Sequence, residues 1–414
     1  MRYIEREITR RAGSRIVGES IALQATSGRF EDKTISIGKD HNINEDLEAL
    51  RAIAIVFVII SHSFALFTWE VPNLMKFLGT FRFLSGVDLF FCVSGFVITR
   101  SLTRQGVLRR SFWDVAKPFW TRRIFRLWPS AWLWASIILI ASALAPEQYW
   151  IGNFMPTLHD FFAAVLNYMD VRLQLCSERG TCGSTMFTIF WSLSLEEQFY
   201  IVYPFLICLM PRRALIGTCI VGIVAQFFIS RQPGSTILFF LRTDAILFGV
   251  LLALLFDTDV YRKLDPRFLR NGWIAAPVLL ALICLLAFIG NASFAPVNTG
   301  LVAIISALLV LIASFDRNYI IPDFPPLHGA VRWVGSRSYT IYLVHLPSFW
   351  ITKIAWAYYL APGRAFYPTF MLRFVVTALI VCVVLAEANY RLVEQPFRDW
   401  GRALTKGMQA RVAS

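Results

Sequence analysis

Long apolar runs separated by short polar segments fill the chain from Leu47 onward. A helix needs about 17 to 25 mainly apolar residues to cross a bilayer. A shorter apolar stretch at 158–168 is expected to lie at the interface or to re-enter the membrane. Ten runs are long enough to cross, near 48–68, 83–103, 127–145, 187–210, 214–230, 236–256, 273–290, 298–315, 339–359 and 368–390. The pattern predicts an all-α polytopic membrane helix bundle of about ten transmembrane helices.

The positive charges divide unequally between the two sets of connecting segments. With both termini inside, the inside segments 100–126, 211–213, 257–272, 316–338 and 391–414 carry 22 Lys and Arg, whereas the outside segments 69–82, 146–186, 231–235, 291–297 and 360–367 carry 6. Segments that stay in the cytoplasm carry the excess of Lys and Arg. This asymmetry predicts that both termini are cytoplasmic, and an eleventh span at 158–168 would invert it.

Composition agrees with this organisation. Hydrophobic residues make up 57% of the 414 residues, and the net charge of +13 comes from residues close to the predicted membrane edges rather than from one basic domain. We therefore expect a lipid bilayer and no nucleic acid among the partners. Three regions follow: a polar, flexible cytoplasmic tail at 1–46 without a secretory signal, a membrane domain at 47–400, and a short cytoplasmic tail at 401–414.

The first apolar run contains two polar groups, Arg51 and His62, within LEALRAIAIVFVIISHSFALF. Eleven residues are almost a whole number of helical turns, so both side chains share one face, separated by about 16 Å along the axis. An ionisable group within a span marks a functional site by default. His62 is therefore a candidate general base, although a histidine that only hydrogen-bonds a neighbouring helix is the alternative.

Two arginines at one membrane edge form the next candidate site. In WTRRIFRLWP, Arg123 and Arg126 are three residues apart and lie close together on one helix face. Guanidinium groups offer planar bidentate donors that suit phosphate. Anchoring of the helix at the cytoplasmic edge is the alternative explanation.

The fourth run contains two adjacent carboxylates within WSLSLEEQFYIVYP. Ser192, Glu196 and Tyr200 recur every four residues and form a polar stripe, while Glu197 points about 100° away. At least one carboxylate should be paired or protonated, so each is a candidate to orient a base or to relay a proton. A structural pairing with an intramembrane arginine is the alternative.

The ninth run contains the second histidine of the predicted spans. In GSRSYTIYLVHLPSFW, Ser338, Tyr342 and His345 lie at i, i+4 and i+7 and face one way. His345 and His62 enter from the same side and lie at similar depth, which predicts a shared polar cavity. A plain hydrogen bond to a neighbouring helix remains open for His345 as well.

Most of the other charged or reactive residues are expected to have structural roles. Arg242 and Asp244, two residues apart in FFLRTDAILFG, are expected to reach different neighbouring helices. In GVDLFFCVSGF, small residues including Ser94 should permit close helix packing, whereas Asp88 could line an acceptor entrance. Cys176 and Cys182, in the longest outside loop, could form a disulfide or remain free thiols.

Several motifs are missing from the sequence, which narrows the chemistry. It contains no Walker-type glycine loop, no HExxH, no CxxC pair and no GxSxG. ATP-driven pumping, metal-dependent hydrolysis and serine hydrolysis have no support, and we expect no metal site.

The motifs together resemble the acyltransferase 3 family of bacterial integral-membrane enzymes, which O-acetylate or otherwise O-acylate glycans and other hydroxylated acceptors. The resemblance runs in order through LEALRAIAIVFVIISH, GVDLFFCVSGF, RRIFRLWP, WSLSLEEQFY, LRTDAILFG, SYTIYLVHLP and ANYRLVEQPFR, covering about residues 47–400. Some members carry a fused SGNH-type hydrolase-like domain, and this chain looks like the stand-alone form. The resemblance implies a multi-pass protein of the bacterial inner membrane.

The resemblance also implies site residues. Arg51 and His62 match the family's essential arginine and histidine, and Arg123 and Arg126 match its paired arginines. These arginines would bind an acyl-CoA as the donor substrate, with acetyl-CoA as the leading candidate. The acyl group would pass to a glycan hydroxyl, as in polysaccharide O-acetylation. His62 would act as base or, alternatively, take the acyl group itself.

Glu196, Glu197 or His345 would support His62 in that scheme. A transporter or flippase of a glycan or lipid-linked intermediate is the main rival interpretation, since it could use the same intramembrane charges. It predicts inverted repeats, which the sequence lacks. A pH-sensing membrane protein is a second rival, and it should bind no acyl-CoA.

Overall fold

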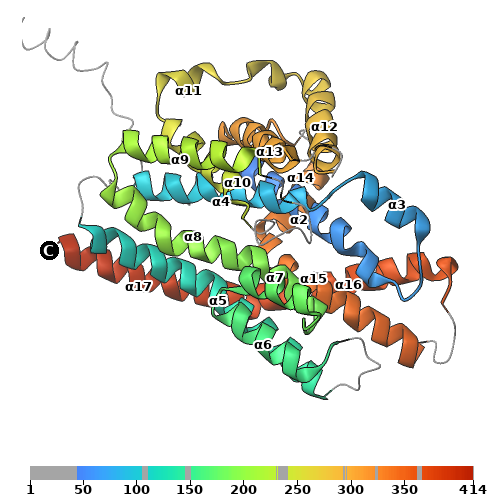
Figure 1. Cartoon of the computed structure of the whole chain (residues 1–414). Helices are drawn as coiled ribbons and strands as arrows, with labels where there is room; N and C mark the ends of the chain where they lie inside the picture. Colours follow the sequence, from blue (N-terminus) through green and yellow to red (C-terminus); the bar gives the residue numbers. More distant parts are fainter. Residues whose placement is uncertain are drawn as a thin grey trace, which may run out of the picture. The chain divides into compact units, whose positions relative to one another are not determined.

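The computed structural model describes residues 44–104, 111–144, 151–229, 231, 241–291, 294, 296–321, 325–360 and 366–413. These residues form helices and connecting turns, without a strand among them. Nearly all of the tail predicted at 1–46 lies outside the described residues. The fold is the all-α bundle that the apolar pattern predicts (Figure 1).

The first half of the bundle is built from α2 to α9. Its α-helices are α2 (Glu45–His62), α3 (Pro72–Thr80), α4 (Ser85–Arg104), α5 (Phe112–Leu144), α6 (Phe154–Val165), α7 (Met169–Arg179), α8 (Phe190–Leu209) and α9 (Arg212–Phe227). Short 3₁₀ turns, η1 (Ser63–Leu66) and η4 (Thr185–Ile189), extend α2 and precede α8. The apolar stretch at 158–168 falls largely in the short helix α6, and its place at the interface stays a prediction.

The second half runs from α10 to α17. Its α-helices are α10 (Thr243–Leu255), α11 (Asp259–Lys263), α12 (Gly272–Ile289), α13 (Asn298–Ser314), α14 (Pro325–Ser336), α15 (Ser338–Ile354), α16 (Met371–Asn389) and α17 (Gln395–Ala413). Two 3₁₀ turns, η6 (Arg267–Arg270) and η9 (Pro368–Phe370), precede α12 and α16, and π-helical segments follow α15 (Ala355–Leu360) and join α16 to α17 (Tyr390–Glu394). In Figure 1, α17 lies alongside α5.

Five helical stretches of the described residues are long and apolar enough to cross a membrane: Glu45–Leu66, Ser85–Arg104, Phe112–Leu144, Gly272–Ile289 and Pro368–Met408. These stretches indicate a multi-pass membrane protein. Two further apolar helices, α10 and α13, are shorter, and α8, α9 and α15 coincide with the remaining predicted spans. The total of about ten crossings and the cytoplasmic termini stay predictions.

Contacts along α4 define its direction relative to two neighbours. Its first turn contacts the start of α10 through Asp88 and Arg242 (3.1 Å), and its last turn contacts the end of α10 through Arg100 and Asp257 (2.7 Å). Helix α8 lies on a further side of α4, where Ser94 contacts Glu196 and, further along both helices, the Thr99 and Tyr203 hydroxyls lie 2.6 Å apart. Helices α4, α8 and α10 therefore run in the same direction.

Two other pairs run in opposite directions. The Trp120 indole donates to the Tyr200 carbonyl (2.9 Å) and the Trp128 indole lies 3.3 Å from Glu197, so α5 is antiparallel to α8. Trp356, just after α15, donates to Thr377 of α16 (3.1 Å), and Asn389 at the end of α16 donates to Thr340 near the start of α15 (3.2 Å), so α15 and α16 are antiparallel. This arrangement brings segments that are distant in sequence to one polar site.

Close packing of α4 depends on glycine. A Cβ atom on Gly86 would lie 2.6 Å from the Ala54 carbonyl oxygen, and one on Gly249 would lie 2.7 Å from the Phe96 backbone nitrogen. A Cβ on Gly95 would also collide with the Ile246 backbone. Small residues allow backbones to approach within a membrane bundle. Glycine therefore fixes α4 against both α2 and α10, as the sequence predicts for Gly86 and Gly95.

The start of α2 is anchored by two side chains. Asn44 caps the helix by accepting from the Leu47 backbone N–H (2.8 Å). The buried carboxylate of Asp46 accepts from the backbone N–H groups of Arg317, Tyr319 and Ile320, at 3.0 to 3.1 Å. These bonds fix the helix that positions Arg51 and His62.

Candidate functional site

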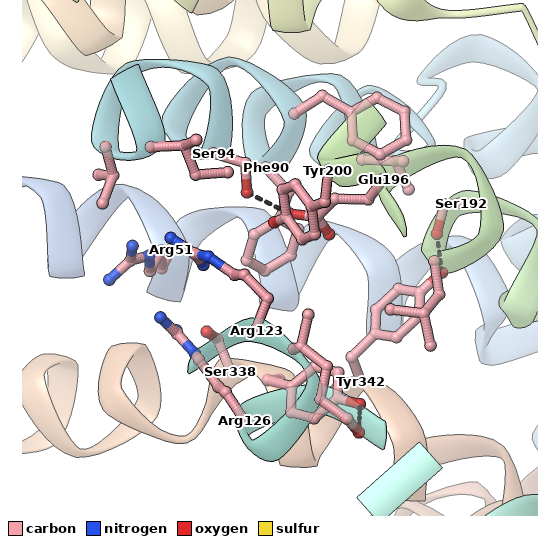
Figure 2. A pocket seen from close by; sticks show the side chains of 17 residues that line it. Arg51, Phe90, Ser94, Arg123, Arg126, Ser192, Glu196, Tyr200, Ser338 and Tyr342 are labelled. Carbon is pink, nitrogen blue, oxygen red and sulfur yellow. Dashed lines mark hydrogen bonds between the residues drawn. The ribbon is translucent and has the colours of Figure 1, made fainter. Parts of the chain in front are cut away.

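A cavity lies among α2, α4, α5, α8 and α15 (Figure 2). With its mouth, it holds about 730 Å³ of space. It extends from Val87 to Ile98 along α4, which corresponds to about 16 Å of helix. The lining residues are Arg51, Val87, Phe90, Phe91, Ser94, Val97, Ile98, Arg123, Arg126, Leu127, Ser192, Leu193, Glu196, Tyr200, Ser338, Tyr339 and Tyr342.

Three arginines gather on one side of this cavity. Figure 2 shows the guanidinium groups of Arg51, Arg123 and Arg126 facing the same space, although they come from α2 and α5. Arg51 forms an ion pair with Glu48 on its own helix. Arg123 lies over the Tyr200 ring, 5.1 Å from its centroid. The buried Nε of Arg126 has no hydrogen-bond partner among the described residues.

The polar stripe of α8 faces the same cavity. Ser192, Glu196 and Tyr200 all line it, as their spacing of four predicts. Glu196 accepts hydrogen bonds from the Ser94 and Tyr200 hydroxyls. Glu196 is the one carboxylate among the lining residues, against three guanidinium groups. The cavity therefore carries an excess of positive charge and suits an anionic ligand.

Glu197 points away from the cavity, as the helical angle predicts. One carboxylate oxygen lies 3.3 Å from the Trp128 indole nitrogen, which donates to it. The other is buried without a hydrogen-bond partner among the described residues. The structure thus separates the two adjacent carboxylates, placing Glu196 in the cavity and Glu197 against α5.

Two hydroxyl groups lie at the end of the cavity remote from the arginines. Ser192 and Tyr342 are hydrogen-bonded at 2.5 Å, and the Tyr342 hydroxyl also donates to the Ile189 carbonyl (2.7 Å). Figure 2 shows this pair across the cavity from Arg51. Ser338 and Tyr342 both line the cavity, so this part of the predicted α15 face is confirmed.

The two histidines contact each other next to the cavity rather than inside it. His62 ends α2, and its Nδ1 lies 3.4 Å from Nε2 of His345. The His345 ring lies 5.9 Å from the Tyr342 ring, centroid to centroid. Neither histidine is among the residues that line the cavity. The two histidines lie close together, but they do not share this polar cavity as the sequence predicts; Tyr342, which lines the cavity, contacts His345.

Backbone carbonyls assign the proton on each imidazole. Nδ1 of His62 lies 2.9 Å from the Val58 carbonyl oxygen, and Nδ1 of His345 lies 2.7 Å from the Tyr342 carbonyl oxygen. A carbonyl only accepts, so both Nδ1 atoms carry the proton in the neutral rings. This leaves a lone pair on each Nε2, and Nε2 of His345 lies 3.4 Å from Nδ1 of His62, whose proton is directed at the Val58 carbonyl.

A buried group of charges lies at the start of α4 and α10, outside the cavity. Arg242 pairs with Asp88 across helices (3.1 Å). Asp244 receives a bidentate contact from Arg231 at 2.7 and 3.0 Å. The prediction that each residue reaches a neighbouring helix is confirmed for Arg242, which pairs with α4, whereas Asp244 pairs with Arg231 in the segment that joins α9 to α10. The interpretation of Asp88 as an entrance residue is wrong, because the side chain is fully buried.

A disulfide joins Cys176 and Cys182, which settles the alternative that the sequence left open. The loop it closes is held further by Asp160, which accepts from Arg172 Nε (2.9 Å) and from the Gly183 backbone N–H (2.8 Å). The bridged segment leads directly into η4 and α8. It therefore supports the chain that positions Ser192.

Sequence analysis missed much of the cavity wall, including Ser94 and Phe90 on α4. Ser94 was expected to serve helix packing, yet it donates to Glu196 in the cavity. Phe90 lines the cavity on the same face of α4. Their four-residue spacing is a signal that could have found them. In the described part of the chain, no group of three or more His, Cys, Asp or Glu side chains could hold a metal ion.

Comparison with known protein families gives one match. The model of a family described as an acyltransferase domain, Acyl_transf_3, matches residues 44–387. This range contains every site residue predicted from the sequence. No solved structure matches this chain.

Several curated proteins are similar over most of this chain. "Putative O-acetyltransferase SACOL0978" of Staphylococcus aureus (strain COL) is 26% identical over 379 residues, which is 86% of this chain and 57% of that protein. "Peptidoglycan O-acetyltransferase OatA" of Listeria monocytogenes is 26% identical, covering 86% and 56%. "Putative peptidoglycan O-acetyltransferase YrhL" of Bacillus subtilis is 28% identical, covering 87% and 56%. The chain thus spans little more than half the length of these relatives.

Proposed function

The chain belongs to the acyltransferase 3 family, and we propose that it transfers an acyl group from acyl-CoA to a hydroxyl group of a polysaccharide, with acetyl as the leading candidate for that group. One observation carries the proposal: an arginine-lined cavity lies beside a pair of imidazoles that contact each other. The names of two relatives suggest peptidoglycan as the acceptor class.

The arginine end of the cavity is the proposed donor site. Arg51, Arg123 and Arg126 together supply planar donors for the phosphate groups of coenzyme A. The unpartnered Nε of Arg126 is a donor available to a ligand. Tyr200 holds the Arg123 guanidinium over its ring, and Glu196 in turn accepts from Tyr200. Glu196 therefore acts as a positioning residue for the donor.

His62 is the proposed general base. Its Nδ1 proton is held by the Val58 carbonyl, so the Nε2 lone pair can accept a proton from the acceptor hydroxyl. That oxygen attacks the thioester carbonyl carbon, the carbon–sulfur bond breaks, and the thiolate of coenzyme A takes the proton back from His62. The step balances without a metal or redox partner.

His345 is the proposed partner of His62. When Nε2 of His62 gains a proton, the positive charge is shared with Nδ1, which lies 3.4 Å from the lone pair on His345 Nε2. His345 would thus orient and stabilise the imidazolium, as a carboxylate does in serine hydrolases. Glu197 lies on another helix face and supports α5 through Trp128 instead.

The arginine end is proposed to face the cytoplasm. Arg51 lies near the start of α2, and Arg123 and Arg126 lie in the predicted inside segment. His62 ends the same helix, about 16 Å further along its axis. Cytoplasmic acyl-CoA would then enter from one side of the inner membrane while the imidazole pair lies deeper in the bundle.

The test is acyl transfer by the purified protein in detergent, with radiolabelled acetyl-CoA and peptidoglycan fragments. Label should pass to the glycan with the wild type and not with His62→Ala or Arg123→Ala. Arg262→Ala removes an exposed guanidinium on α11 and serves as the charge-matched control. If no acyl-CoA is bound or turned over, the donor assignment is wrong and transport becomes the leading interpretation.

A further inference from the structure

We propose that the end of the cavity remote from the arginines selects the donor by acyl chain length, admitting acetyl and excluding longer chains. Val87, Phe91 and Leu193 set the limit. The inference rests on the proposed function, because it assumes that the cavity binds an acyl-CoA. It adds to that function the range of acyl groups that the enzyme transfers.

The cavity has two chemically different ends. Contacts place Arg123 and Arg126 beside the later residues of α8 and α4, since Trp120 contacts Tyr200 and Thr99 contacts Tyr203. Val87 lies about three helical turns earlier on α4 than Ile98. Leu193 lies near the start of α8, directly after Ser192. A donor held by its phosphates at the arginines therefore points its acyl group toward Val87 and Leu193.

The side chains at this second end are buried and packed against one another, and we infer that they close it. Val87, Phe91 and Leu193 are only 3%, 2% and 6% exposed although all three line the cavity. The Phe91 ring is backed by the Trp191 ring, which meets it edge to face at 6.3 Å. Two buried aromatic rings in contact leave Phe91 little room to move.

Side chains packed in this way oppose added volume. A packed interior resists the insertion of even one methylene, because neighbouring groups must leave their preferred rotamers. A hydrophobic pocket usually discriminates about tenfold or more for each methylene. Acetyl adds one methyl beyond the thioester carbonyl, whereas butyryl adds two further methylenes against the closed end.

The experiment measures kcat/KM with acetyl-, propionyl-, butyryl- and hexanoyl-CoA. Wild type should prefer acetyl over butyryl by roughly tenfold or more. Leu193→Ala enlarges the closed end and should reduce that preference at least tenfold. Val87→Leu adds a methylene to the wall and should lower propionyl transfer relative to acetyl by roughly tenfold. Opposite shifts in the two variants cannot come from misfolding.

Val97→Ala is the matched control, because Val97 lines the cavity one to three turns nearer the arginine end. It should leave the ratio of acetyl to butyryl transfer unchanged. Equal transfer of acetyl and hexanoyl by the wild type, or an unchanged ratio in Leu193→Ala, would overturn the proposal alone. Failure to transfer any acyl group from any acyl-CoA would instead overturn the proposed function.

Discussion

His62 is the side chain whose removal should cost the most activity. General base catalysis contributes about 10²–10⁴-fold to rate, so His62→Ala should lower kcat by about that factor. The side chain is half-buried and ends its helix, so the melting temperature should change little. The measurement is kcat beside Tm, with His328→Ala on α14 as control. Retained kcat in His62→Ala would exclude the base assignment.

Arg123 should act through the phosphates of the donor. Arg123→Lys keeps the charge but loses the bidentate geometry, and a hydrogen bond to a charged group is worth about 1.5–3 kcal/mol. KM for acetyl-CoA should therefore rise roughly tenfold or more. Acetyl-pantetheine lacks those phosphates, so its KM should not change. Equal effects on both donors would place Arg123 outside the phosphate site.

At the scale of single residues, the sequence predicts those features that the geometry of one helix determines. The stripe of Ser192, Glu196 and Tyr200 and the divergence of Glu197 follow from 3.6 residues per turn. The hydrogen bond from Ser94 to Glu196 does not, because it depends on how α4 and α8 are offset. The absence of His345 from the cavity wall likewise depends on tertiary packing, because Tyr342 occupies the wall beside it.

Helix contacts in this bundle depend on glycine at defined crossings. Gly249→Ala would place a Cβ 2.7 Å from the Phe96 backbone nitrogen, and α4 would have to move. Overpacking of this kind costs about 1–3 kcal/mol. We expect a lower Tm in detergent and loss of acyl transfer, because α4 forms one wall of the cavity.

Gly217→Ala on α9 is the control for that substitution. Nothing lies within 4 Å of its added Cβ, and alanine favours a helix over glycine by about 1 kcal/mol. Tm should therefore stay the same or rise. A Tm for Gly249→Ala equal to that of Gly217→Ala would contradict the close approach of α4 and α10.

Element boundaries were less predictable than element positions. The run at 127–145 predicts only part of α5, which begins at Phe112 and includes Pro118 and Pro129. Hydropathy cannot detect the amphipathic first turns, which contain the arginines. Residues 395–413 form α17, which packs along α5. The contact between α17 and α5 stabilises both α17 and the polar first turns of α5.

At the scale of the whole molecule, the relative directions of the helices can be compared with the predicted order of membrane crossings. Parallel α4, α8 and α10, with α5 antiparallel, are the directions that an alternating chain of ten crossings requires. A sequence can predict this alternation from its loop charges. It cannot predict which helices become neighbours, and the cavity depends on those neighbours.

The predicted sidedness can be tested by cysteine labelling in intact cells. Glu70→Cys and Lys263→Cys replace exposed residues at opposite ends of the bundle. A membrane-impermeable maleimide should label Glu70→Cys directly, above the wild-type background, and Lys263→Cys only after permeabilisation. Labelling of both without permeabilisation would contradict the proposed topology.

The most direct test of the central claim is a cryo-electron microscopy structure with a non-hydrolysable acetyl-CoA analogue. The account predicts density in the cavity, with phosphates at Arg51, Arg123 and Arg126 and the acetyl group near Leu193. Density for the analogue at any other site, with this cavity empty at saturating concentration, would contradict the assignment of the donor site.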